Sequence, residues 1–269
     1  MFDEGARPMR VITMMTQKGG SGKSTIARGL VGAAEARGLS VALLDTDTTE
    51  NTLDWATKAA QGGFWNHDIA VFQTLNAREV DPIVREIEED EESVDLLIID
   101  TPGDARDIHE ACLGLSDLIL CPINLSEQAI NTALKTVDFI ERARATVEDP
   151  SQVGVLRVVL NLLDSRAPAS VLRQERRVRE DLMVTGAADR PTSRLPLMRT
   201  EIRRRAAYVE MEEKGLLGRM LEPGGRRDVT RRRPGLRHDG HLIAAHEEMN
   251  RLLDECLELT SAVMAEEVH

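Results

Sequence analysis

The stretch "TQKGGSGKST", residues 16–25, decides the fold of this chain. It overlaps the end of a β-rich run, "RVITMMT" (10–16), and the start of "STIARGLVGAAEARG" (24–38), which has helical spacing and closes with Gly38. A glycine-rich turn between a strand and a helix directs backbone N–H groups and a helix N-terminus at one point, which favours phosphate. We therefore predict a phosphate-binding loop at this place.

The loop departs from the common P-loop in one respect. Its end matches the G-K-[ST] part of that pattern with Gly22, Lys23 and Ser24. The standard loop has a further glycine five residues before Gly22, where this chain has Gln17. The sequence instead reads K-G-G-x-x-K-[ST] from residue 18 to residue 24, so a second lysine, Lys18, stands ahead of the paired glycines.

Strand-like and helix-like patterns alternate along the rest of the chain. Strands are expected at 40–47, 69–74, 94–103, 117–123, 155–163 and 193–197. Helices are expected in an acidic stretch that runs to about residue 92, and at 126–146, 168–184, 199–214 and 241–267. Alternation of this kind predicts an α/β fold with three layers, in which helices cover both faces of a mostly parallel, twisted sheet. We expect one domain over 1–269, with a flexible basic loop at 222–240 and a closing helix at 241–267.

Three aspartates stand at the ends of expected strands. Asp45 and Asp47 end the run at 40–47, and Asp100 ends "VDLLIID" before a Pro-Gly turn. Ligands of open α/β sheets bind at the carboxyl ends of the strands, so these side chains are candidates for a site beside the loop. The alternative for each of them is a cap on the following helix.

Together, the loop, "LLDTDTTEN" and "IIDTPGD" resemble the ParA/MinD family of ATPases, whose phosphate loop has this deviant form. The resemblance covers roughly the first 215 residues and implies a P-loop NTPase fold. The small size, Trp55 after the aspartates and the helix "VLRQERRVREDL" are most similar to short ParA proteins and to VirC-type proteins of conjugative transfer.

The resemblance also implies roles for individual residues, with ATP and Mg²⁺ as the ligands. Lys18 is expected to reach the ATP bound by a partner subunit, and Asp47 to position the attacking water. The magnesium ligands implied are Ser24, Asp45 and Asp100. The ATP phosphates are expected to lie against Gly19, Gly20, Ser21, Gly22, Lys23, Ser24 and Thr25. Asn161 is expected at the adenine edge, with a helix cap as its alternative, and Pro196 in the loop that completes the base pocket.

The charge distribution bears on the partner. The net charge is −12, yet residues 166–205 hold eleven arginines against five acids, and a second basic run lies at 224–241. Aromatic residues make up only 3% of the chain, which favours neutralisation of a duplex backbone over stacking on single strands. The expected contacts to DNA are Arg173, Arg176, Arg177, Arg199, Arg203, Arg204 and Arg205; a solvated helix face is the alternative for each.

The resemblance implies a magnesium-dependent ATPase that forms a homodimer on ATP and, together with the arginine-rich segments, favours binding to double-stranded DNA without sequence specificity. The resemblance implies slow hydrolysis that a ParB-like or other adaptor protein stimulates, in a cytoplasmic, nucleoid-associated protein that partitions or positions a plasmid, a transfer complex or another large cargo. Only nine residues precede the first expected strand, so no helix-turn-helix domain is expected before it. The family's partition members commonly carry an aspartate at the position of Ala129, so any role of that acid is absent.

Three alternatives remain. A MinD-like protein that positions itself on membranes would need a basic closing helix, whereas the polar face of 241–267 is acidic. A metallochaperone or iron-protein relative would need cysteine ligands, and Cys112 and Cys121 have no such context. A phosphotransferase would need an acceptor pocket. No apolar run approaches the roughly 20 residues that a membrane span needs, so no membrane-spanning segment is expected.

Overall fold

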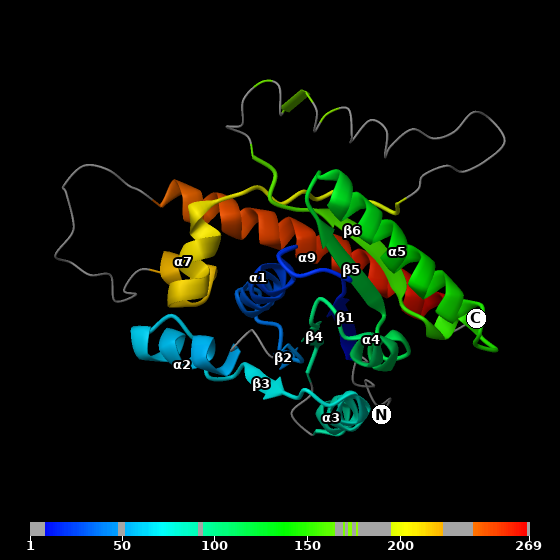
Figure 1. Cartoon of the computed structure of the whole chain (residues 1–269). Coiled ribbons are helices and arrows are strands. Elements are labelled where there is room, and N and C mark those ends of the chain that lie inside the picture. The colour runs from blue at the N-terminus through cyan, green and yellow to red at the C-terminus, as the bar shows by residue number, and fades with distance from the viewer. Residues whose placement is uncertain are drawn as a thin grey trace, which may run out of the picture.

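A computed structural model describes residues 9–47, 52–90, 94–164, 195–222 and 239–267, together with the isolated residues 169, 172, 173 and 176. Within these residues six strands form one sheet in the order β3-β2-β4-β1-β5-β6, and every pairing is parallel (Figure 1). The strands are β1 (Arg10–Met14), β2 (Val41–Asp45), β3 (Ala70–Gln73), β4 (Leu96–Asp100), β5 (Leu118–Ile123) and β6 (Val155–Leu160).

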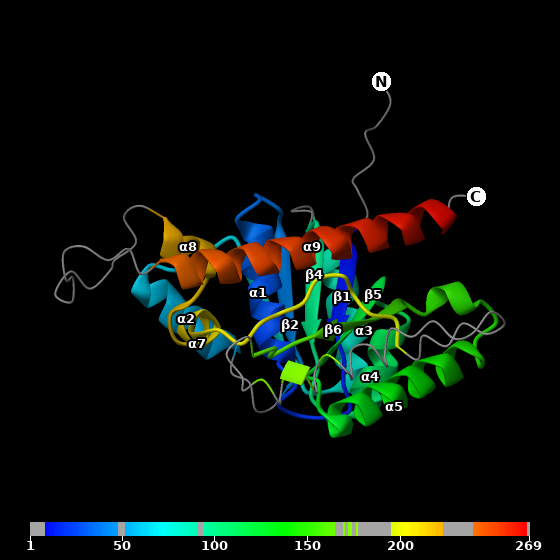
Figure 2. The same cartoon turned by 90° about the horizontal axis from the view of Figure 1, so that it is seen from above.

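Helices cover both faces of this sheet. They are α1 (Lys23–Glu35), α2 (Thr52–Gly62), α3 (Ala77–Glu89), α4 (Arg106–Leu113), α5 (Glu127–Arg144), the short 3₁₀ helix η1 (Pro150–Gln152), α7 (Ala206–Lys214), α8 (Leu217–Leu221) and α9 (Gly240–Glu267). Figure 2 shows α9 and α5 on opposite sides of the strands. Among the described residues, no helix is long and apolar enough to cross a membrane.

Alternation along the strands divides the core in two. On β1, Ile12 and Met14 belong to the cluster beneath α1 and α9, whereas Val11 belongs to the cluster beneath α3, α4 and α5. Successive side chains of a strand point to opposite faces, so a strand that is apolar throughout needs a covering layer on each side. The predicted three-layer α/β fold is confirmed.

The segment before α7 differs from the sequence prediction. A helix over 199–214 was expected, but α7 begins only at Ala206 and the preceding residues are extended. Single parallel bridges, Val158↔Leu197 and Leu163↔Arg203, attach this segment to β6 and the residues after it. Of the strand expected at 193–197, the structure describes only residues 195–197, which form the single bridge at Leu197; the predicted helix is wrong over its first two turns.

The physical reason lies in α9. The backbone N–H groups of Arg199 and Thr200 donate to the carboxylate of Glu255, at 2.7 and 2.9 Å. Glu248, one heptad earlier on α9, accepts two hydrogen bonds from the Arg205 guanidinium, at 3.0 and 2.5 Å. The N–H groups of Ile202, Arg203 and Arg204 would close the first turns of a helix that began at 199. That of Arg203 instead donates to Glu248, at 3.4 Å, and those of Ile202 and Arg204 donate to the backbone oxygens of Leu160 and Leu163, at 2.8 and 2.9 Å. We call Glu248, Glu255 and the segment 199–205 that they hold the α9 latch.

Candidate functional site

Strand register brings the candidate residues together at one edge of the sheet. Asp100 of β4 pairs with Met14 of β1 on one side and with Asp45 of β2 on the other. The glycine loop leaves β1 just beyond Met14, so the loop and both aspartates lie at the carboxyl ends of three adjacent strands. This is where open α/β sheets bind ligands. We call the loop 16–25 with Asp45, Asp47 and Asp100 the ligand edge.

The loop has a backbone that favours glycine. Gly20 and Gly22 have φ angles of 74° and 89°, in the left-handed region. Gly22 is also the N-cap of α1, and no side chain of the described residues caps that helix terminus. The N–H groups at a helix N-terminus favour an anion as their ligand. Lys23 opens the helix and is 6% exposed.

Two contacts hold the loop from outside. The amide of Asn161, 2% exposed, donates to the backbone oxygen of Ser21 at 2.8 Å, while its oxygen accepts from the N–H of Leu162 at 2.7 Å. Gly103, after β4, packs against the loop so closely that a Cβ there would lie 2.5 Å from the Gly19 nitrogen. Asn161 thus supports the phosphate loop, a part that the sequence did not suggest; its contact with adenine stays a prediction.

Lys18 lies on the outside of the loop. It is exposed, and its Nζ donates to Oε1 of Gln128, near the start of α5, at 2.8 Å. The neighbouring Thr16 hydroxyl donates to the backbone oxygen of Lys18 at 2.8 Å and shapes the turn before it. Lys18 and Lys23 therefore occupy different places, one exposed and one buried.

The aspartates differ in their surroundings. Asp45 is fully buried, and its two carboxylate oxygens accept from the backbone N–H groups of Asp47 and Thr52, at 2.9 and 3.2 Å. Burial raises the pKa of Asp45 above its ordinary value, and these hydrogen bonds oppose the rise only in part. Asp100 is 2% exposed and Asp47 is half-buried.

The donor set fits a magnesium ion. Ser24 lies in the first turn of α1, Asp45 and Asp100 are neighbours in register, and all three offer oxygen. Mg²⁺ prefers oxygen and usually keeps several waters, so a pair of carboxylates and a hydroxyl suffice. No group of three or more His, Cys, Asp or Glu side chains suited to a metal gathers in the part of the chain that the structure describes. Cys112 and Cys121 are buried, and burial raises the pKa of each thiol to about 12, which disfavours a cysteine-ligated metal.

An aromatic pair stands behind the aspartates. Trp55 and Trp65 make an edge contact with their ring centroids 5.1 Å apart. The Arg28 guanidinium lies 5.1 Å from the Trp55 ring centroid, and its charge lowers the pKa of Asp45 while burial raises it more. The indole N–H of Trp55 donates to the backbone oxygen of Met211 at 2.8 Å. This hydrogen bond joins α2, the helix after Asp45 and Asp47, to α7. A contact between Arg28 and this site has no local sequence signal.

Two contacts concern the segments for which the sequence predicts the base pocket. Pro196 is half-buried, and its backbone oxygen accepts from the N–H of Val158 on β6 at 2.7 Å. The hydroxyl of Thr25 donates to Glu212 of α7 at 2.5 Å. The first contact attaches the segment after 195 to β6, and the second brings α7 to the end of the loop.

The arginines predicted to contact DNA fall into three groups. Arg199 and Arg205 pair with α9 carboxylates, Arg199 with Glu258 and with Glu255. Arg203 and Arg204 are exposed, and no ion pair of theirs is recorded among the described residues. Arg173 and Arg176 are exposed too, and Arg177 lies outside the described residues. The expected helical presentation of the arginines at 203–205 is wrong, because these residues precede α7.

Comparisons with known proteins agree with this geometry. The family model described as VirC1 protein matches residues 9–259. Protein virC1 of Rhizobium rhizogenes is 26% identical over 210 residues, which are 78% of this chain and 83% of the relative. A Cyanothece McdA variant in complex with ATP has a TM-score of 0.61 at 13% identity and covers 93% of this chain and 97% of its own. The pNOB8 ParA bound to nonspecific DNA has a TM-score of 0.52 at 15% identity, with 94% and 99% covered.

Proposed function

The chain belongs to the VirC1 family and has the fold of ParA/MinD ATPases, and from this premise we propose that it is a magnesium-dependent ATPase that dimerises on ATP and binds duplex DNA. The observation that carries the proposal is the separation of the two loop lysines. Lys23 is buried at the start of α1, whereas Lys18 is exposed on the outer side of the loop. An exposed lysine there can neutralise the phosphates of a second nucleotide that faces it.

The chemistry assigned to the site is phosphoryl transfer to water. The loop N–H groups and Lys23 bind the phosphates, and Asp47 orients a water molecule toward the γ-phosphorus. The bond between that phosphorus and the oxygen of ADP breaks as the water oxygen attacks, and the proton passes from water to the released phosphate. Ser24, Asp45 and Asp100 would hold magnesium, which when bound would neutralise the charge of the phosphate oxygens. Hydrolysis removes the γ-phosphate that joins two protomers, so the dimer would separate.

DNA binding in the ATP state is the second part of the proposal. Exposed arginines near the C-terminal part of the fold, Arg203 and Arg204 among them, would contact phosphates without reading bases. Such a protein could coat DNA near a plasmid or transfer complex in the nucleoid until an adaptor protein stimulates hydrolysis. The membrane alternative is weaker because α9 places Ala245, Met249 and Leu252 in the core beneath it.

The test of the proposal is ATP-dependent association. Sedimentation velocity of the chain with Mg²⁺ and a non-hydrolysable ATP analogue should give a dimer, and the same chain without nucleotide a monomer. Lys18→Ala should bind the analogue with unchanged affinity and remain monomeric. Lys58→Ala, which removes another exposed lysine, is the matched control and should dimerise. A monomer of the wild-type chain at saturating analogue would refute the proposal.

DNA and membrane binding can be compared in one further experiment. With the analogue bound, the chain should retain a random-sequence DNA duplex, and the retention should fall steeply as salt rises. Anionic liposomes should retain none of it. Retention by liposomes and not by DNA would favour the MinD-like alternative.

A further inference from the structure

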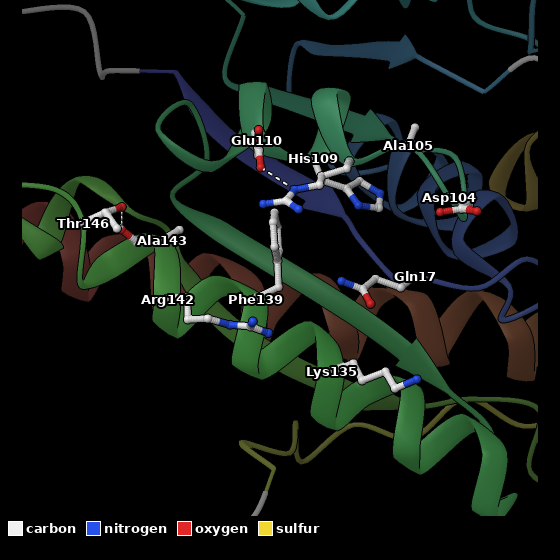
Figure 3. A pocket seen from close by; sticks show the side chains of 11 residues that line it. Gln17, Asp104, Ala105, His109, Glu110, Lys135, Phe139, Arg142, Ala143 and Thr146 are labelled. Atoms are coloured by element: carbon white, nitrogen blue, oxygen red, sulfur yellow. Dashed lines mark hydrogen bonds and ion pairs between the residues drawn. The ribbon is translucent and has the colours of Figure 1, made fainter.

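A groove of about 680 Å³ lies between α4 and α5, on the side of the sheet opposite α9. One end of it reaches Gln17, the residue before Lys18 in the loop. Figure 3 shows side chains from both helices and Gln17 around the same space. Nothing in the nucleotide chemistry described above uses this groove.

On the α5 wall of the groove, three side chains lie along one face of the helix. Lys135, Phe139 and Arg142 follow each other at spacings of four and three residues and line the groove together. Lys135 and Arg142 are exposed, and neither has a recorded ion pair within the described part of the chain; Arg142 donates only to the backbone oxygen of Asp138, at 2.9 Å. Two cations that flank an aromatic ring are therefore left for an outside partner.

The α4 wall is already balanced. Arg106 pairs with Glu110 on the same helix, with 2.7 Å between Nε and Oε1. Of the charged side chains that line the groove, three are cations and two are anions, the second anion being Asp104. The groove is thus a locally positive place on a chain whose net charge is −12. Charge complementarity favours an acidic occupant.

The groove is connected to the phosphate loop through α4. His109, 2% exposed, lies in the groove wall, and its Nε2–H donates to the backbone oxygen of Pro102 at 2.9 Å. Burial lowers the pKa of His109, which favours the neutral ring with the proton on the nitrogen that faces Pro102. Pro102 is followed by Gly103, which packs directly on Gly19. A change at the groove therefore has a short route to the loop, in addition to the direct one through Gln17.

We propose that the groove between α4 and α5 is the docking site of an acidic amphipathic helix of the partner protein that stimulates hydrolysis. That this partner stimulates hydrolysis rests on the proposed ATPase function, whereas the docking of an acidic helix does not depend on that function. Lys135 and Arg142 are seven residues apart on α5, about 10.5 Å at 1.5 Å per residue. The matching helix presents two carboxylates one heptad apart, with a leucine or similar side chain between them against Phe139.

The probe is a fluorescein-labelled, capped 15-residue helical peptide with glutamates at positions 4 and 11 and leucines at 7 and 8. Its partner peptide has lysines in place of the glutamates. Fluorescence anisotropy, without nucleotide, should show the wild-type chain binding the acidic peptide at least tenfold more tightly than the basic one. The double variant Lys135→Glu/Arg142→Glu should reverse this preference. Lys58→Glu/Arg78→Glu makes the same change of charge at other exposed positions and should keep it.

Equal affinities for the two peptides, no saturable binding at millimolar peptide, or an unchanged preference in the Lys135→Glu/Arg142→Glu variant would each overturn the proposal. Phe139→Leu, which keeps an apolar side chain but loses the ring, should weaken the acidic peptide severalfold and leave basal hydrolysis unchanged.

The coupling to the loop needs a separate readout. The acidic peptide should raise the ATP turnover of the wild-type chain, and His109→Phe should bind the peptide with equal affinity yet respond less. A full response in His109→Phe would exclude the route through Pro102. If the chain binds the peptide but hydrolyses no ATP at all, the docking site stands and the proposed function fails.

Discussion

Asp45 at the ligand edge and Glu248 in the α9 latch are both buried carboxylates, with 0% and 2% exposure. Their partners differ. Glu248 is matched by the Arg205 guanidinium and the Tyr208 hydroxyl, the latter at 2.9 Å. Asp45 has backbone N–H donors, a side-chain hydrogen bond from Thr52 and a longer-range charge effect from Arg28. Removal of a buried acid that a cation and a hydroxyl share leaves those partners unpaired, whereas a buried acid held by neutral donors carries an uncompensated desolvation cost of its own.

The largest expected effect separates chemistry from folding at the ligand edge. Asp47→Ala should lower ATP turnover by about 100-fold or more, the usual contribution of a group that positions or activates the attacking water. Because Asp47 is half-buried, the substitution should change the free energy of unfolding of the protein little. Phosphate release at saturating MgATP and urea denaturation measure the two quantities. Near-normal turnover would remove Asp47 from its assigned role.

A change in the α9 latch should lower the free energy of unfolding and have little effect on ATP turnover. Glu248→Ala leaves the Arg205 side chain, which is 25% exposed, and the Tyr208 hydroxyl without their shared acceptor. The free energy of unfolding should fall by about 2–3 kcal/mol, at the lower end for a broken buried pair because Arg205 regains water. Urea denaturation at neutral pH measures it. Unchanged stability would contradict the distinction between the two carboxylates.

A glycine pair tests the loop against an ordinary turn. Gly22 and Gly38 both have positive φ, 89° and 74°. A Cβ on Gly22 would lie 2.2 Å from Nδ2 of Asn161, whereas a Cβ on Gly38 meets nothing within 4 Å. Gly38→Ala should lose about 1 kcal/mol of stability from the backbone alone. Gly22→Ala should lose more and should also weaken ATP binding, which calorimetry can measure. Equal losses in both variants would show that Asn161 gives way freely.

The comparison of the two carboxylates also predicts a pH dependence. Since burial raises the pKa of Asp45, the folded state binds its proton more tightly than the unfolded state does. Stability from this group therefore decreases as pH rises from the unfolded to the raised folded pKa, and the cost persists at neutral pH. Asp45→Ala removes the titrating carboxyl, so the free energy of unfolding lost in this variant should be larger in acid than at pH 7; urea denaturation of both proteins at several pH values measures it. A loss that grows as pH rises would contradict the sign.

The smallest effect concerns the arginines of the segment 199–205. Arg203→Ala and Arg204→Ala should each weaken DNA binding and reduce the slope of log affinity against log salt by about one. Arg205→Ala should act through the α9 latch and lower stability, with little change in that slope. Filter binding at several salt concentrations gives the slopes. A larger slope change for Arg205 than for Arg203 would reverse the assignment of the two groups.

Most of the sheet could be predicted from the sequence because its signals are local. The apolar runs at 40–47, 94–103 and 117–123 contain β2, β4 and β5, and the expected closing helix at 241–267 matches α9 within one residue at its start. The helix expected at 199 is wrong because the competing acceptors are remote: Ile202 and Arg204 donate to the backbone oxygens of Leu160 and Leu163, and Arg203 to the carboxylate of Glu248, 45 residues further along the chain. Side-chain acceptors at that separation leave no trace in periodicity.

The candidate site divides in the same way. Lys18, Lys23, Asp45 and Asp100 were found from short motifs at the ends of strands, and register then brought them to one edge. Gln128, which accepts from Lys18, is 110 residues away in sequence and belongs to no motif. The amide of Asn161 likewise donates to Ser21 of the loop and accepts from Leu162. The contact with Ser21 depends on the order of the strands, in which β5 lies between β6 and β1.

The edge contact between Trp55 and Trp65 has a practical consequence. These are the only two tryptophans of the whole chain. Both therefore emit from one location, at α2. The Trp55 ring also lies against the Arg28 guanidinium. Intrinsic fluorescence of the unlabelled protein would therefore report any change around α2 on addition of nucleotide, with no background from tryptophans elsewhere.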